Sequence, residues 1–204
     1  GATGMWVHSM ITLSSVLVSV LICFVIGVPL GVIASYNKWY RDIQNVVLDA
    51  MQTLPYFCYL IPVLMFFGGN IVSAVIATVI YSVPPIIRLT ALGLSQVSGS
   101  YSEVSKSFGG TGIQTLNKVK FPLAVPSLVM GFNQTVIMAF AMQIVTPLIG
   151  GKGLGLQVFN ALQRSDTGRG LSAGLAIVLL AIIIDRITHA WTKKQRQALG
   201  LDKS

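Results

Sequence analysis

The sequence has few charged residues: they occupy 10% of its 204 positions, whereas apolar residues occupy 53%. Soluble domains carry about 25% charged residues, so this chain could not form an ordinary charged surface. Residues 9–37 and 121–151 contain no charge, and residues 43–87 contain only Asp49. Because about 20 apolar residues cross roughly 30 Å of hydrocarbon as a helix, the composition predicts an all-α integral membrane protein.

Cysteine and histidine are equally scarce, with two of each. Cys23 and Cys58 lie in apolar stretches without a CxxC spacing, and His8 and His189 lie far apart in the sequence. These spacings favour neither a disulfide nor a metal site. No Ser-His-Asp set, HExxH motif or carboxylate pair can be placed at one membrane depth, so we expect no catalytic centre.

A phosphate-binding loop is also missing, because the pattern G-x-x-x-x-G-K-[ST] does not occur in the sequence. Residues 150–153 are rich in glycine and include Lys152, but neither Ser nor Thr follows this lysine. We therefore expect the chain to bind no ATP, and we interpret residues 150–153 as a flexible turn.

Five apolar segments are long enough to span a membrane: residues 9–34, 43–67, 71–89, 121–149 and 171–191. We assign them to a single transmembrane domain over residues 1–204. All eight prolines lie in or beside these segments. Proline is tolerated in lipid where neighbouring helices or water satisfy the freed carbonyls, which is typical of a transporter or channel.

Gly27 and Gly31 predict a small-residue packing face on the first segment. The amino-terminal Gly-Ala-Thr-Gly is not a signal peptide and leaves room for helices upstream.

Basic residues divide unevenly between the two sides that this topology creates. Lys152, Arg164 and Arg169 lie on one side. Loop 37–42, the polar segment 95–120 and the carboxyl tail lie on the other side, which holds eleven: Lys38, Arg41, Arg88, Lys106, Lys118, Lys120, Arg186, Lys193, Lys194, Arg196 and Lys203. The positive-inside rule places the eleven in the cytoplasm, and the amino terminus and residues 150–170 outside. Because the basic residues sit at the ends of apolar segments, we expect no nucleic-acid partner.

The segment 95–120 is a polar elbow between the third and fourth apolar segments. Apolar residues recur at helical spacing in its first half, at Val97, Tyr101, Val104 and Phe108. Gly109 and Gly110 would end that helix, and Thr111 with Gln114 has the spacing of a capping box. The pattern predicts two short helices lying against the cytoplasmic face of the membrane.

The spacing of Glu103, Gly109 and Pro122 resembles the EAA loop of bacterial ABC-importer permeases. The departures from that pattern are conservative in size: Val104 and Ser105 replace two alanines, and Val119 and Phe121 replace Ile and Leu. Segments from about residue 12 to residue 192 also resemble, in order, the glycine betaine/proline betaine permeases. These segments are residues 49–55, 59–62, 84–90, 133–135, 153–155 and 180–188.

The resemblance implies a five-span type I ABC importer permease core in the bacterial plasma (inner) membrane. It implies three protein partners: a second permease copy, a cytoplasmic ABC ATPase that binds ATP and Mg, and an extracytoplasmic substrate-binding protein. This chain would bind no cofactor itself, and its elbow would be the coupling helix that fits the ATPase. The expected ATPase-coupling residues are Glu103, Ser105, Lys106, Phe108, Gly109 and Gly110.

A solute path through the spans would be lined by polar side chains, which are costly to expose to lipid. Aromatic faces could attract a quaternary ammonium by about 0.5–2 kcal/mol each. The candidates are Gln52, Thr53, Tyr56, Phe57, Tyr59, Asn133, Gln134, Thr135 and Gln143. Interhelical hydrogen bonding and core packing are the alternative roles for each of them.

An ion-coupled secondary transporter or channel is the alternative function. Ion coupling usually uses a carboxylate within the membrane, and Asp49 and Asp185 are the two candidates, both expected near the cytoplasmic ends of their segments. The sequence does not distinguish betaine, proline betaine, choline, carnitine, trimethylamine oxide or a sulfonium analogue as the solute.

Overall fold

The computed structural model describes the backbone of residues 2–198 and the side chains of residues 5–190. Within these residues the protein is all-helical, which confirms the expected fold class. The elements are α1 (Ala2–Tyr36), α2 (Lys38–Thr53), α3 (Phe57–Phe67), α4 (Ile71–Ser82), α5 (Pro84–Gln96), α6 (Gly99–Ser107), α7 (Gly112–Thr115), the π-helix η1 (Leu116–Lys120), α8 (Phe121–Met142), the 3-10 helix η2 (Thr146–Ile149), α9 (Leu154–Gln163) and α10 (Thr167–Ala198).

Four stretches of the described chain are long and apolar enough to cross a membrane: Met5–Tyr36, Ile71–Gln96, Gly112–Met142 and Thr167–Ala190. The expected span at residues 43–67 is not one continuous helix. It consists of α2 and α3, which meet at 95°. Pro55 explains the break, because proline disfavours a helical conformation in the preceding residue, and Leu54 is extended with φ −68° and ψ 131°.

The other boundaries also differ from the sequence-based expectation. The third span continues past residue 89 to Gln96, because Pro84 and Pro85 occupy the first positions of α5, where a missing N–H is harmless. The fourth span ends at Met142 instead of residue 149. Its start is continuous with the second half of the elbow through the π-helix η1, and α9 was not expected.

Three clusters of buried apolar residues hold the helices together. The first lies among α1, α2, α5 and α8, and the second among α1, α8, α9 and α10. The third joins α3 and α4 to the end of α8 and η2. A Cβ on Gly27 would overlap the Ile86 side chain, and one on Gly31 would lie 2.7 Å from the Ile87 carbonyl oxygen. The predicted small-residue packing face on α1 is therefore the contact with α5.

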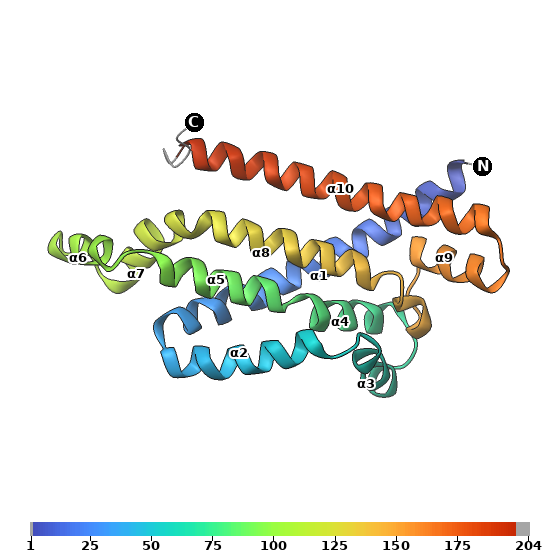
Figure 1. Cartoon of the computed structure of the whole chain (residues 1–204), viewed down its shortest axis with the longest axis horizontal. Helices are drawn as coiled ribbons and strands as arrows, with labels where there is room; N and C mark the ends of the chain where they lie inside the picture. Colours follow the sequence, from blue (N-terminus) through green and yellow to red (C-terminus); the bar gives the residue numbers. More distant parts are fainter. Residues whose placement is uncertain (1, 199–204) are drawn as a thin grey trace.

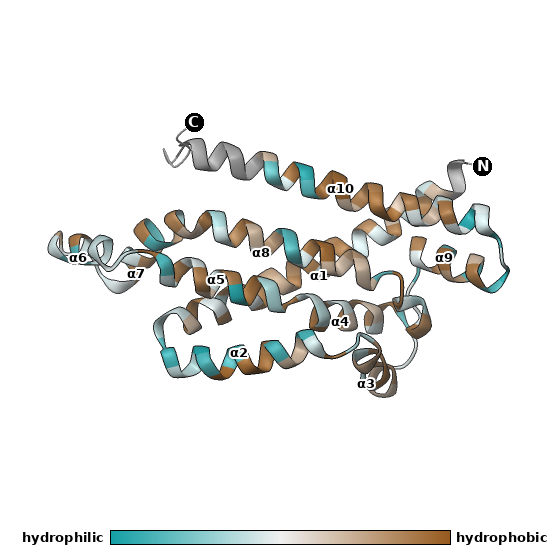
Figure 2. Ribbon diagram, in the orientation of Figure 1, coloured by the Kyte–Doolittle hydropathy of each residue, from teal (hydrophilic) through white to brown (hydrophobic). Residues whose placement is uncertain are grey.

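The long helices run along one axis and give the molecule two distinct ends (Figure 1). The α1–α2 turn, the elbow formed by α6 and α7, and the carboxyl end of α10 lie toward one end. The amino terminus, α3, η2 and α9 lie toward the other end. Figure 2 shows hydrophilic residues on α2 and at the elbow, whereas α1, α8 and the first half of α10 are mostly hydrophobic. The side chains of Lys193, Lys194 and Arg196 lie outside the described ones, and Lys203 lies outside the described residues.

Candidate functional site

The elbow between α5 and α8 is a helix-turn-helix, as predicted. The Ser98 hydroxyl caps α6 by accepting the N–H of Ser100 at 3.4 Å. Gly109 ends α6 with φ +77°, a conformation that favours glycine. Thr111 and Gln114 form the expected capping box, with reciprocal hydrogen bonds of 2.9 and 3.4 Å. Val97 does not belong to the first helix, because its extended ψ of 119° separates α5 from α6.

Ser105 and Gly110 join the two halves of the elbow. The hydroxyls of Ser105 and Thr115 lie 2.8 Å apart and link α6 to α7. The Gly110 N–H donates to the Ser105 carbonyl at 2.9 Å. A Cβ on Gly110 would lie 2.6 Å from Ser105 Oγ, whereas one on Gly109 would meet nothing within 4 Å. The two adjacent glycines therefore have different roles: Gly109 permits the turn, and Gly110 permits the close approach.

The apolar face of the elbow is not packed against the rest of the chain. The exposed fractions of Tyr101, Val104 and Phe108 are 54%, 55% and 88%. A groove of about 470 Å³ runs beside them and is lined by Tyr101, Val104, Ser105, Phe108, Gly110, Gln114, Lys118 and Val119. Glu103 and Lys106 are exposed, and among the side chains that the structure describes neither forms an ion pair. This surface combines an apolar groove with free charges of both signs, which suits a protein partner.

The expected path residues fall into an exposed group and a buried group. Gln52 and Thr53 are exposed at the end of α2, and the Thr53 hydroxyl donates to the Ala50 carbonyl at 3.0 Å. Tyr56 is 39% exposed beside the bend, with its ring centroid 4.5 Å from that of Phe57. The Tyr59 hydroxyl donates to the Met51 carbonyl, so it ties α3 back to α2 across the bend. Gln134 on α8 is also exposed.

Asn133, Thr135 and Gln143 form the buried group on α8 and at its end. Each has a buried polar atom without a hydrogen-bond partner: Asn133 Oδ1, Thr135 Oγ1 and Gln143 Nε2. Leaving such an atom unpaired costs about 1–3 kcal/mol, so these atoms need water, a solute or another arrangement of the helices. None of the path candidates lines the elbow groove or a second groove, which runs along α1. The structure thus leaves their role as a prediction.

The expectation of a flexible turn at residues 150–153 is wrong. Gly151, Gly153 and Gly155 are buried. A Cβ on Gly155 would overlap the Gln143 carbonyl oxygen, so this backbone packs directly against the end of α8. The Thr12 hydroxyl accepts the Leu154 N–H at 2.8 Å. The glycines permit tight packing here, and their spacing was the one signal of it in the sequence.

Two further contacts were not expected from the sequence. On α1, one helical turn before Thr12, His8 Nε2 lies 3.1 Å from Gln157 Nε2 of α9. Arg88 Nη2 of α5 lies 2.5 Å from Asp49 Oδ1 of α2. Arg88 is not at the end of its span, as the charge count assumed, because the span continues for eight more residues to Gln96. Without Arg88, eleven minus one leaves ten basic residues on the side of the elbow, against three on the other side, so the charge asymmetry persists.

Residues 27–197 match the family model described as "Binding-protein-dependent transport system inner membrane component". The chain belongs to this family. It is 44% identical over 196 residues to the glycine betaine/proline betaine transport system permease protein ProW of Escherichia coli (strain K12). The aligned residues cover 96% of this chain and 55% of ProW. It is 46% identical over 185 residues to the glycine betaine/carnitine transport permease protein GbuB of Listeria monocytogenes, covering 91% of this chain and 66% of that protein.

More distant similarities agree with this assignment. The trimethylamine N-oxide transport system permease protein TmoV of Ruegeria pomeroyi is 36% identical over 200 residues, which are 98% of this chain and 30% of that protein. An inward-facing structure of the MetNI methionine ABC transporter matches with a TM-score of 0.75 and 24% identity, over 89% of this chain and 93% of that one. The structural match shows a shared fold. The chain spans little more than half the length of ProW.

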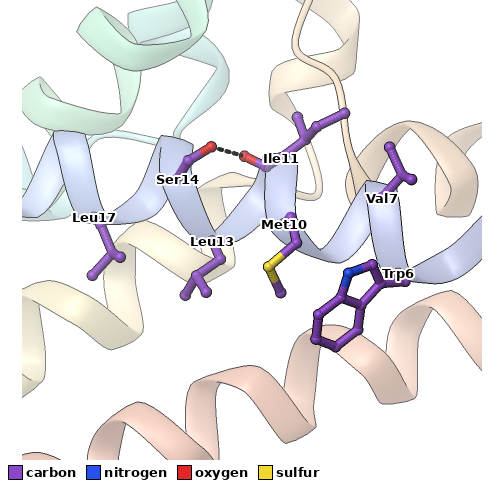
Figure 3. Close-up of a pocket in the computed structure, with 7 residues that line it drawn as sticks. All are labelled: Trp6, Val7, Met10, Ile11, Leu13, Ser14 and Leu17. Atoms are coloured by element: carbon purple, nitrogen blue, oxygen red, sulfur yellow. Dashed lines mark hydrogen bonds between the residues drawn. The ribbon is translucent and has the colours of Figure 1, made fainter.

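Membership of an inner-membrane family also explains the second groove, of about 570 Å³, along α1 (Figure 3). Its lining is apolar except for the indole N–H of Trp6 and the hydroxyl of Ser14, which donates to the Ile11 carbonyl of its own helix at 3.0 Å. Apart from the Trp6 indole N–H, the side chains of this lining offer a solute no free polar group. The groove therefore has the chemistry of a surface for an acyl chain or an apolar helix.

Proposed function

We propose that this chain is the permease subunit of an ATP-driven ABC importer for a compatible solute such as glycine betaine or a related methylated amine. The observation that carries the proposal is the elbow, whose apolar groove and unpaired charges lie at one end of an apolar helix bundle. The family match and the transport functions for which ProW and GbuB are named support it. A chain without a phosphate-binding loop would receive its energy through such a contact.

In this proposal the elbow end faces the cytoplasm and the amino terminus of α1 faces outward. Two copies of the chain pair in the membrane, and each elbow fits a cytoplasmic ATPase subunit that binds ATP and Mg. This chain binds no cofactor of its own. An extracytoplasmic binding protein delivers solute to the end that carries α9. Closure of the ATPase pair would tilt the spans as rigid bodies, because the elbow is continuous with α8 through η1.

The elbow contact is proposed to include Glu103, Ser105, Lys106, Phe108, Gly109 and Gly110. Ser105 and Gly110 hold the shape of the turn, whereas Phe108, Glu103 and Lys106 present side chains to the ATPase. The solute path is proposed to use Gln52, Thr53, Tyr56, Tyr59, Asn133, Gln134 and Gln143. The unpaired buried polar atoms of Asn133 and Gln143 support this role, since a hydrated path would satisfy them.

Charge-neutralising variants of the elbow test the proposal. Glu103→Gln and Lys106→Gln should reduce binding of the partner ATPase to the purified permease and reduce solute uptake by reconstituted vesicles. Lys152→Gln is the matched control for ATPase binding, because Lys152 is exposed in the loop before α9, and α9 lies toward the end opposite the elbow. Equal ATPase binding and uptake in all three variants would contradict the proposed contact.

The ion-coupled alternative has less support from the structure. Its candidate carboxylates both have basic neighbours: Asp49 lies 2.5 Å from Arg88, and Asp185 Oδ1 lies 3.4 Å from His189 Nε2. The charge of Arg88 would weaken the attraction of Asp49 for a coupling cation. Uptake that persists in vesicles without ATP would favour this alternative.

A further inference from the structure

A polar stripe runs along the whole of α2. Asp42, Asn45, Asp49 and Gln52 follow one another at intervals of three, four and three residues, so they share one face of the helix. Asp42, Asp49 and Gln52 are exposed, and Asn45 is half-buried. The neighbouring exposed face is apolar and contains Trp39, Ile43, Val46 and Val47. A third face, with Gln44 and Leu48, packs toward the core.

The Asp49–Arg88 ion pair belongs to this stripe and lies away from the elbow end of α2 and α5. At 1.5 Å per residue, Asp49 is about 17 Å along α2 from Lys38, and Arg88 is about 12 Å from the end of α5 at Gln96. The two side chains keep exposed fractions of 63% and 37%. Charges at such depth almost always face water, another protein or each other and avoid lipid. The stripe is therefore not a lipid-facing surface, in contrast to the apolar face beside it.

Both partners of the pair retain unused hydrogen-bonding capacity. One guanidinium nitrogen of Arg88, Nη2, contacts Asp49, whereas its buried Nε has no partner. This contact uses one of the two carboxylate oxygens of Asp49. A guanidinium binds a carboxylate through paired hydrogen bonds, and a carboxylate attracts a cationic head group. A small dipolar molecule could therefore lie between the two groups with its charges matched.

We propose that the α2 stripe lines the aqueous route of the solute, and that Asp49 and Arg88 form a transient recognition point for a zwitterion. In the solute-free protein the two side chains neutralise each other. A passing zwitterion replaces that contact, its carboxylate meeting Arg88 and its methylated ammonium meeting Asp49. This inference rests on the proposed function and makes the pair selective for dipolar solutes over simple cations.

Thiol labelling tests the first half of the proposal without any need for transport. In a cysteine-free parent (Cys23→Ser, Cys58→Ser), Gln52→Cys should react with a charged methanethiosulfonate reagent in membranes of the assembled complex. Val46→Cys is the matched control on the apolar face of the same helix, and its reaction should be at least roughly tenfold slower. Equal reaction at both positions, or oxidative cross-linking of Gln52→Cys between two permease copies with no labelling, would overturn the proposal.

Charge variants test the second half. In vesicles that contain the whole complex, we compare the initial uptake of glycine betaine with that of choline, which has the same head group without the carboxylate. Arg88→Gln should lower the betaine-to-choline ratio roughly tenfold, because it removes one charge-assisted contact. Asp49→Asn should slow both solutes, since each carries the ammonium. A purely structural pair would slow both solutes equally in both variants, which would overturn the recognition role.

Failure of the proposed function gives a different pattern. The unsubstituted complex would then take up neither solute with ATP, whatever the labelling result. The reaction of Gln52→Cys relative to Val46→Cys still decides whether the stripe faces water.

Discussion

Phe108 offers the sharpest test of the elbow as a docking surface. Its side chain is 88% exposed in the isolated chain, so it contributes almost nothing to the fold. Full burial of a phenylalanine side chain in a partner stabilises by about 1.5–3 kcal/mol. Phe108→Ala should therefore weaken binding of the ATPase to the permease in nanodiscs by roughly 10- to 150-fold. The dissociation constant can be measured by titrating labelled ATPase, and the thermal stability of the permease should stay unchanged.

Phe66→Ala provides the matched control. Phe66 is 83% exposed, on α3 toward the opposite end of the molecule. Its removal should leave ATPase binding within about twofold of the parent, since it deletes the same side chain from a surface without the proposed contact. The account fails if Phe108→Ala binds the ATPase like the parent, or if both variants lose affinity to the same extent.

Three further substitutions follow from backbone contacts. Gly110→Ala should speed proteolysis of the elbow, because its Cβ would lie 2.6 Å from the Ser105 side-chain oxygen. Gly109→Asn is the control and should be cleaved at close to the parent rate. The added side chain would meet open space there, and Asn tolerates the left-handed conformation. Gly155→Ala should lower the melting temperature, with overpacking that costs about 1–3 kcal/mol, while Gly174→Ala on α10, with no atom within 4 Å, should not lower it. Thr12→Val should cost about 1–3 kcal/mol in a denaturant titration, since it leaves a buried N–H unpaired; an unchanged midpoint would contradict that contact.

Local sequence patterns were sufficient for the elbow. The Thr111 and Gln114 spacing specifies a capping box, and Gly109 supplies the positive φ, so both features depend on neighbours in sequence. The apolar composition likewise predicted the long helices, because spanning length is a property of single segments. The pattern could not predict the tertiary surroundings of each residue. Val97 fitted the helical period and still lies between two helices.

Long-range contacts account for what the sequence did not reveal. Asp49 and Arg88 are 39 residues apart, and Thr12 and Leu154 are 142 apart. Neither pairing can be inferred before the helices are placed beside each other. The 95° bend at Leu54 was also missed, because hydropathy over residues 43–67 indicates one span and does not report the break that Pro55 causes. The glycines at 150–153 looked like a flexible turn because their crowding arises from other parts of the chain, namely α1, η2 and residues 69–70.

The energy source of uptake tests the central claim most directly. The permease would be reconstituted with its ATPase and binding protein in vesicles, and glycine betaine uptake would be followed with ATP inside and with ion gradients collapsed by ionophores. We predict uptake that requires ATP hydrolysis and persists without ion gradients. Uptake that continues without the ATPase, or that follows an imposed sodium or proton gradient, would contradict the account.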